Sequence, residues 1–113
     1  MHEVGIAENI LCIVKDVAQK QNLRYIKKVV LEIGQFSGVV PALLRFALEW
    51  ACRDSIMEKT EIEVISPALR LCCQHCKTEY SADMEDLRCP VCKGEDFDTL
   101  QGREMLVKAI IGG

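Results

Sequence analysis

Apolar residues recur at helical spacing near the start of the chain. One face of the predicted helix carries Ile6, Ile10, Val14 and Val17. The spacings of four, four and three residues between them match the period of an α-helix, and charged residues occupy the opposite face. The pattern therefore predicts an amphipathic helix of about five turns, with Asn22 as its stop signal.

Three later stretches alternate apolar and polar residues with a period of two, which is typical of a strand with one buried face. They cover residues 25–33, 61–65 and 102–111. In the last stretch the alternation predicts one face with Met105, Val107, Ala109 and Ile111, and a second, partly covered face with Leu106 and Ile110. Pro67 ends the middle strand or marks it as an edge.

A second helix is predicted from Pro41 to about Arg53, because proline fits the first helical position, where its missing N–H is not needed. Apolar residues cover most of its circumference: Leu43, Leu44, Phe46, Ala47, Leu48, Trp50 and Ala51. We therefore expect this helix to be more deeply buried than the first or to contact a partner.

The strongest chemical signal is a pair of Cys-x-x-Cys motifs. They are Cys73-Gln74-His75-Cys76 and Cys89-Pro90-Val91-Cys92, with residues 77–88 between them. Two such turns can place four thiolates around one tetrahedral zinc ion. A thioredoxin-like redox site needs one motif at the start of a helix, and this polar segment predicts none. The spacing indicates a zinc ribbon.

Two neighbours of these ligands leave alternatives open. Cys72 with Cys76 would give a three-residue spacer that zinc also tolerates, but Cys73 matches the spacing of the second motif. His75 lies between two ligands and is either an exposed residue of the turn or a contact to the ligands or a partner. Cys12 and Cys52 fall within apolar helical patterns, and we expect both to be buried.

The order of elements predicts an α+β fold. Strand patterns lie on both sides of the cysteine segment, so we expect a three-stranded sheet with two helices that carries an inserted zinc-ribbon module. The predicted domains are residues 1–69 plus 100–113, and a zinc-ribbon domain at residues 70–99.

Composition excludes several classes of protein. A net charge of −3 gives no basic surface for nucleic acid. No apolar run approaches the roughly 18 residues that a membrane helix needs. The cysteine count of seven is odd and four of them have metal spacing, which argues against a secreted disulfide scaffold. These features predict a cytoplasmic protein.

The first two residues form a possible metal site. In a chain that begins Met1-His2, the terminal amine, the backbone nitrogen of His2 and its Nδ1 atom can enclose one ion. Such a planar, nitrogen-rich set suits Ni(II) or Cu(II), whereas Zn(II) prefers tetrahedral sites. A dipeptide alone is a weak signal.

Several motifs together resemble the HypA family, the nickel metallochaperones of hydrogenase maturation. The resemblance rests on Met1-His2-Glu3, on residues 31–39 (LEIGQFSGV), on residues 44–49 (LRFALE) and on the two Cys-x-x-Cys motifs. It spans nearly the whole chain. The chain departs from the family at Val4-Gly5, where a larger residue and a helix-capping Ser or Thr are common, and in the additional Cys72.

The resemblance implies two metal sites. Nickel would bind Met1, through its terminal amine, His2 and Glu3, and structural zinc would bind Cys73, Cys76, Cys89 and Cys92. It also implies partners, namely a HypB-type GTPase and the large subunit of [NiFe]-hydrogenase, and in some organisms urease maturation proteins.

The resulting hypothesis is a nickel metallochaperone that is not an enzyme. The sequence has no phosphate-binding glycine-rich loop, no nucleophile and histidine pair, and no open three-ligand zinc site. Two alternatives remain: a zinc-ribbon interaction adaptor without transferable metal, and a thiol redox protein that uses Cys72, Cys73 and Cys76.

Overall fold

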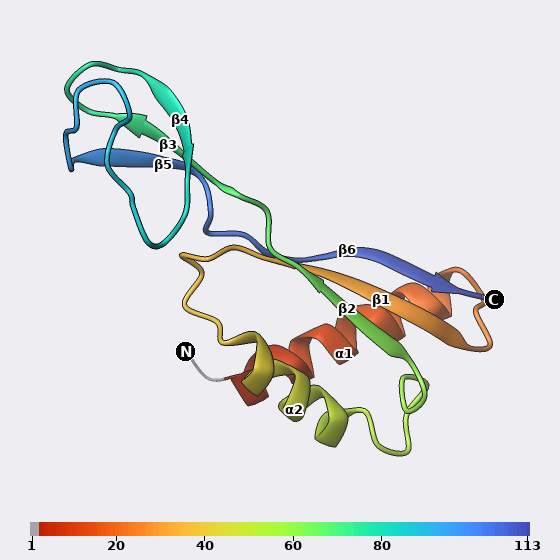
Figure 1. The fold of residues 1–113 in the computed structure, drawn as a ribbon. Helices are drawn as coiled ribbons and strands as arrows, with labels where there is room; N and C mark the ends of the chain where they lie inside the picture. The colour runs from red at the N-terminus through yellow and green to blue at the C-terminus, as the bar shows by residue number, and fades with distance from the viewer. Residues whose placement is uncertain (1–2) are drawn as a thin grey trace.

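The computed structural model describes residues 3–113 of the chain (Figure 1). Two helices and six strands follow one another along the sequence. They are α1 (Glu3–Lys20), β1 (Ile26–Ile33), α2 (Pro41–Ala51), β2 (Glu61–Ile65), β3 (Leu69–Cys73), β4 (Glu79–Ala82), β5 (Phe97–Gln101) and β6 (Met105–Gly112). The strands form two sheets of three strands each, and the α+β class predicted from the sequence is confirmed.

The first sheet has the strand order β2-β1-β6, and both helices cover the same face of it (Figure 1). β1 is central, pairing in parallel with β2 and antiparallel with β6. Parallel neighbours need a crossover connection, and α2 provides it between β1 and β2. This sheet is the predicted one, completed by the C-terminal strand.

The first helix follows the sequence pattern. Ile6, Ile10 and Val14 are buried against the sheet, where they meet Val29 and Leu31 of β1. α1 ends at Lys20, and shortly afterwards Asn22 has a left-handed backbone with φ of 56°. Asparagine tolerates this conformation better than most residues. The stop signal at Asn22 is therefore confirmed.

The second helix is less buried than predicted. Leu44, Ala47 and Leu48 face the core, whereas Leu43, Phe46 and Trp50 are 54%, 61% and 58% exposed. α1 buries five of its 18 residues and α2 three of its 11, so α2 is not the more deeply buried helix. The prediction of deeper burial was wrong because the helices lie in one layer on one sheet face, so only one side of α2 meets the core. The alternative prediction, contact with a partner, stays open.

The C-terminal strand changes phase within its length. Val107 pairs with Leu31, but Ile110 pairs with Val29, because the register shifts opposite Val30 and leaves Lys108 outside the pairing. This β-bulge turns Ile110 to the core side. The sequence placed Val107 and Ala109 on one face of the strand. Val107 does lie on the core side, but Ala109 pairs with Val30, whose side chain points away from the core, so the prediction was wrong after the bulge.

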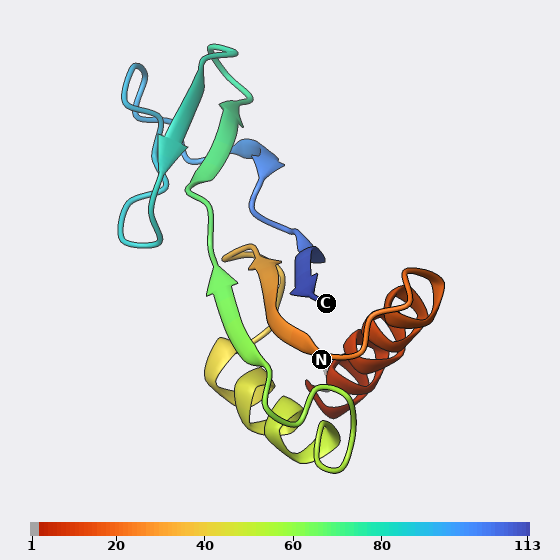
Figure 2. The ribbon, with the colours of Figure 1, turned by 90° about the vertical axis from the view of Figure 1, so that its right-hand side faces the viewer.

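The second sheet has the order β4-β3-β5 and lies at the end of the elongated molecule away from the helices (Figure 2). It has a small apolar cluster of its own, made by Leu71, Cys73, Tyr80 and Cys89. β3 and β5 carry the chain out of and back to the first sheet. The proposed division at residues 70 and 99 stays a prediction, although it falls within these two strands.

The loop after β1 contacts the segment between β5 and β6. The Phe36 N–H donates to the Gly102 carbonyl at 2.7 Å, and the Phe36 ring stacks on Phe97 with 6.1 Å between ring centroids. Gly34 packs against the Gly102 backbone so closely that a Cβ at Gly34 would overlap the Gly102 carbonyl. These contacts join the first sheet to the second.

We predict opposite effects for two glycine substitutions. Gly34→Ala should lower the free energy of unfolding by more than about 1 kcal/mol, since backbone must move to admit the methyl group. Gly5→Ala should leave it unchanged or raise it by up to about 1 kcal/mol, because alanine favours the helix and nothing lies within 4 Å of that Cβ. Urea denaturation measures both. Equal effects would contradict the close approach at Gly34.

Candidate metal centre

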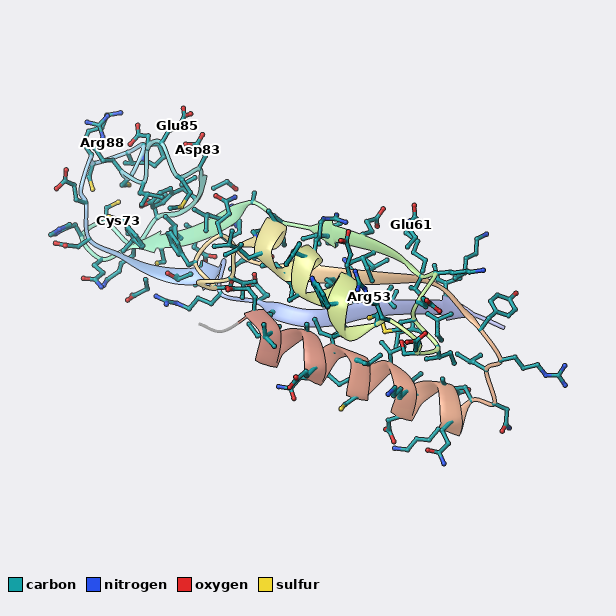
Figure 3. All side chains as sticks on the ribbon, turned by 90° about the horizontal axis from the view of Figure 1, so that it is seen from below. Arg53, Glu61, Cys73, Asp83, Glu85 and Arg88 are labelled. Carbon is teal, nitrogen blue, oxygen red and sulfur yellow. The ribbon has the colours of Figure 1, made fainter. Side chains whose placement is uncertain are left out.

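The four predicted zinc ligands come together in the second sheet. The Sγ atoms of Cys73, Cys76, Cys89 and Cys92 all lie within 4.8 Å of one another. Two separations join the motifs: 3.4 Å from Cys73 Sγ to Cys92 Sγ and 3.5 Å from Cys76 Sγ to Cys89 Sγ. Figure 3 shows Cys73 in this part of the molecule, at a distance from Arg53 and Glu61.

The two motifs have the same backbone hydrogen bonds. The Cys73 N–H donates to the Thr78 carbonyl, and the Lys77 N–H donates back to the Cys73 carbonyl at 3.0 Å. In the second motif the Cys89 N–H donates to the Gly94 carbonyl, and the Lys93 N–H donates to the Cys89 carbonyl at 2.9 Å. Each motif is therefore a closed turn that directs its two sulfurs inward.

Left-handed residues make these turns possible. Lys77 and Lys93 directly follow the motifs, with φ values of 61° and 64°. Gly94 comes next in the second turn, where a Cβ would lie 2.8 Å from the His75 ring and 3.2 Å from Cys92 Sγ. Only glycine fits so close to the sulfurs without displacing them.

The cluster has the dimensions of a tetrahedral thiolate site. Zn–S bonds of about 2.3 Å in a tetrahedron place the sulfurs about 3.8 Å apart. The separations of 3.4 and 3.5 Å between the motifs are close to that value, and all four sulfurs lie within 4.8 Å of one another. The sulfurs are too far apart for a disulfide, whose S–S bond is about 2.05 Å. Four thiolates with no open position fit a structural zinc ion.

The thiols of the cluster differ in acidity. The pKa of Cys76 is lowered to about 6, chiefly by a hydrogen bond with the Thr78 side chain, whose Oγ1 lies 3.2 Å from Cys76 Sγ. The backbone of Cys76 lowers the pKa of Cys73. At Cys92 the Gly94 N–H favours the thiolate, but the adjacent thiols and burial outweigh it and raise the pKa to about 11. A cation at the centre would remove this conflict.

Cys72 does not belong to the cluster. It precedes Cys73 in β3, where successive side chains point to opposite faces. Its Sγ lies 3.8 Å from the Lys77 carbonyl oxygen, on the outer side of the turn. His75 is also outside the cluster, with Nε2 3.2 Å from Asp96 Oδ2 and a largely exposed side chain.

The two helical cysteines have different environments. Cys52 is buried beside Met57, and burial raises the pKa of its thiol. Cys12 is exposed, so the prediction that it is buried was wrong. It lies on α1 beyond the edge of the buried face that Ile10 and Val14 define.

Tyr80 supports the metal centre, a role that the sequence did not reveal. Its ring is buried with Cys73 and Cys89, and its hydroxyl donates to the Leu87 carbonyl at 2.7 Å. Burial first, and then the negative charge of the nearby cysteines, raises the pKa of this hydroxyl. The bond holds the segment between the two motifs against the sheet. The alternation of residues in β4 is the sequence feature that could have indicated a buried Tyr80, but a strand of four residues is too short to recognise from sequence.

The predicted nickel ligands Met1 and His2 lie outside the described residues. Glu3 is the first residue of α1 and is partly buried. Among residues 3–113, the four cysteines are the only group of three or more cysteine, histidine or carboxylate side chains close enough to share an ion. In the same range no helix is long and apolar enough to cross a membrane.

Fold and site together define a two-helix α+β protein with a four-cysteine module of the zinc-ribbon type. The family described as "Hydrogenase/urease nickel incorporation, metallochaperone, hypA" matches residues 1–111. The chain therefore belongs to the HypA family, as its motifs predicted.

Individual relatives agree over almost the whole chain. Proteins named hydrogenase maturation factor HypA from Trichodesmium erythraeum and Crocosphaera subtropica are 37% and 33% identical to it, covering 96% of this chain and 92% of each relative. The solution structure of the Ni metallochaperone HypA from Helicobacter pylori has the same fold, with a TM-score of 0.69 and 22% identity. It covers 99% of this chain and 97% of the other.

We predict that the two adjacent cysteines of β3 respond differently to substitution. Cys73→Ser and Cys76→Ser should lower the zinc content and disorder the second sheet, because so small a module folds with its ion. Cys72→Ser, the matched control, should retain one zinc per chain. Elemental analysis and amide NMR spectra measure both effects. If only Cys72→Ser lost zinc, the ligand would be Cys72 and not Cys73.

We also predict that zinc binding releases protons. Near pH 7 the thiol at Cys92 is protonated, since its pKa is about 11, and binding must remove that proton. Acidification should therefore release zinc, because protons compete for the thiolates. A dye that reports free zinc during acid titration measures this, with Cys72→Ser as the control. A zinc content that does not fall on acidification would contradict binding by thiolates.

Proposed function

We propose that this protein is a nickel metallochaperone that binds Ni(II) at its N-terminus and delivers it during maturation of [NiFe]-hydrogenase. The observation that carries the proposal is the family match over residues 1–111, which begins at the Met1-His2-Glu3 triplet. The family's description also includes urease, so a second nickel enzyme is a possible client.

In this proposal the zinc ion is structural. Cys73, Cys76, Cys89 and Cys92 are its ligands, supported by their mutual distances and by the closed turns that carry them. A four-thiolate set leaves no coordination position for a substrate. The ion instead stabilises a module whose own apolar cluster is small.

The nickel ion is the transferable one. Its donors are the terminal amine of Met1, the backbone nitrogen and Nδ1 of His2, and the carboxylate of Glu3 or solvent in a remaining position. Glu3 opens α1, so the helix fixes the place of this carboxylate relative to α2. Ligands at a chain end can leave one after another, which suits a carrier that must hand over its ion.

The proposed function is that of a carrier and includes no catalytic reaction. The proposed partners are a HypB-type GTPase and the large subunit of [NiFe]-hydrogenase, with urease maturation proteins as further candidates. The proposed location is the cytoplasm. The alternative function is an interaction adaptor that carries zinc alone. The exposed apolar side of α2 gives this alternative some support, since it fits a protein partner with or without nickel.

We predict that nickel binding depends on the first two residues and leaves zinc unaffected. His2→Ala should abolish binding of the nickel equivalent, because the imidazole donor is lost. A residue added before Met1 should weaken binding, since the amine becomes an amide. Glu3→Gln should have a smaller effect. Titration of the zinc-loaded protein with Ni(II), read by absorbance, measures all three, with Glu8→Gln as the control.

Two further results decide between the functions. Nickel affinity should fall as the pH drops from about 8 to 6, because protons compete for the amine and imidazole. An extended His2→Ala protein that still binds one nickel as tightly as the parent would exclude the N-terminal site and favour the adaptor.

A further inference from the structure

An apolar groove runs between the start of α1 and the exposed side of α2. Its volume is about 460 Å³. The side chains that line it come from both helices: Glu3, Val4, Glu8, Leu43, Phe46 and Trp50. Two of the buried residues of α2, Leu44 and Leu48, do not line the groove, whereas the third, Ala47, does.

The exposed residues of α2 have the spacing of a binding face. Leu43, Phe46 and Trp50 follow one another at three and four residues, so they form one stripe along the helix. Val4 on α1 is 62% exposed and forms the opposite wall. Scattered apolar residues are normal on a surface, but a continuous set with two aromatic rings marks an interaction site.

The described part of the groove carries charge of one sign. Among residues 3–113, Glu3 and Glu8 are the only charged residues that line it, and both stand on the α1 wall. Arg53 lies outside this lining, with its guanidinium carbon 4.0 Å from the centre of the Trp50 ring. Figure 3 shows Arg53 just beyond the end of α2, away from the cysteine module. An occupant of the groove therefore meets apolar side chains flanked by two carboxylates.

We infer that this groove is the docking surface for an amphipathic helix of a protein partner, with lysine or arginine along the edge of the helix's apolar face. A helix matches a groove whose anchors repeat at helical spacing. Basic residues match Glu3 and Glu8. A second copy of this chain fits less well, since its own groove would present the same two carboxylates.

The place of the groove links it to nickel transfer, and in this respect the inference rests on the proposed function. Glu3 lines the groove and is also a proposed nickel ligand. A helix docked on Phe46 and Trp50 would bring its protein next to Glu3, where nickel held by that ligand could pass between the two. Docking can be tested separately, because it does not require the ion.

The experiment uses the zinc-loaded full chain and two synthetic helical peptides of about five turns. Both have the same leucine face, and one carries lysine where the other carries glutamate. Trp50 is the only tryptophan of the chain, so its fluorescence reports contact in the groove. The lysine peptide should shift the Trp50 emission to shorter wavelength and bind more weakly as salt increases. The glutamate peptide should leave the emission unchanged.

Substitutions separate docking from general attraction of a basic peptide. Phe46→Asp should weaken binding of the lysine peptide by about tenfold or more, although it adds a negative charge that would strengthen purely electrostatic binding. Glu8→Gln should weaken it by about two- to fivefold. Met84→Asp, at an exposed apolar residue away from the groove, should have no such effect and is the matched control.

Specific results would overturn the inference. They are equal binding of both peptides, unchanged binding by Phe46→Asp, or a dimer in sedimentation that Phe46→Asp dissociates, since a second copy would then occupy the groove. Nickel titration of the same proteins keeps the two proposals apart. If the unsubstituted protein binds the lysine peptide but no nickel, the docking surface stands and the nickel function is refuted. If it binds nickel but not the peptide, the nickel function stands and the docking surface is refuted.

Discussion

Pairing of β1 with β6 is the constraint on which the rest of the structure depends. β6 comes from the end of the chain, yet it completes the sheet that β1 begins, and the cysteine module lies between the two in sequence. Both ends of the module are therefore fixed to one sheet. This arrangement lets a segment with a small apolar cluster stay ordered when its metal supplies the remaining stabilisation.

The metal centre also depends on backbone geometry that repeats. Each Cys-x-x-Cys turn is closed by the same pair of hydrogen bonds and followed by a left-handed lysine. Each turn therefore orients its own two sulfurs, and the sheet that carries the turns brings the two pairs together. The pKa values of the thiols differ for separate reasons: hydrogen bonds with Thr78 lower that of Cys76 to about 6, and at Cys92 the adjacent thiols and burial outweigh the Gly94 N–H and raise it to about 11.

The metal ligands and the helix boundaries could be predicted because each depends on a short local pattern in the sequence. The spacing of the cysteines identified the four residues that converge, and Asn22 and Pro41 marked helix ends by their backbone preferences. The phase change in β6 could not be predicted, since the bulge at Lys108 depends on pairing with β1. The exposure of Phe46 likewise depends on which side of α2 meets the sheet, and apolar residues around the whole helix do not reveal that.

The bulge at Lys108 has a consequence for solubility. β6 is an edge strand with exposed apolar residues at Met105, Leu106 and Ile111, a combination that promotes pairing between strands of different molecules. The bulge interrupts the regular pleat in the middle of this edge and places there a lysine, whose Nζ lies 3.7 Å from Glu32 Oε1. A flat foreign strand could match only half of the edge at a time, so one extra residue protects the sheet against aggregation.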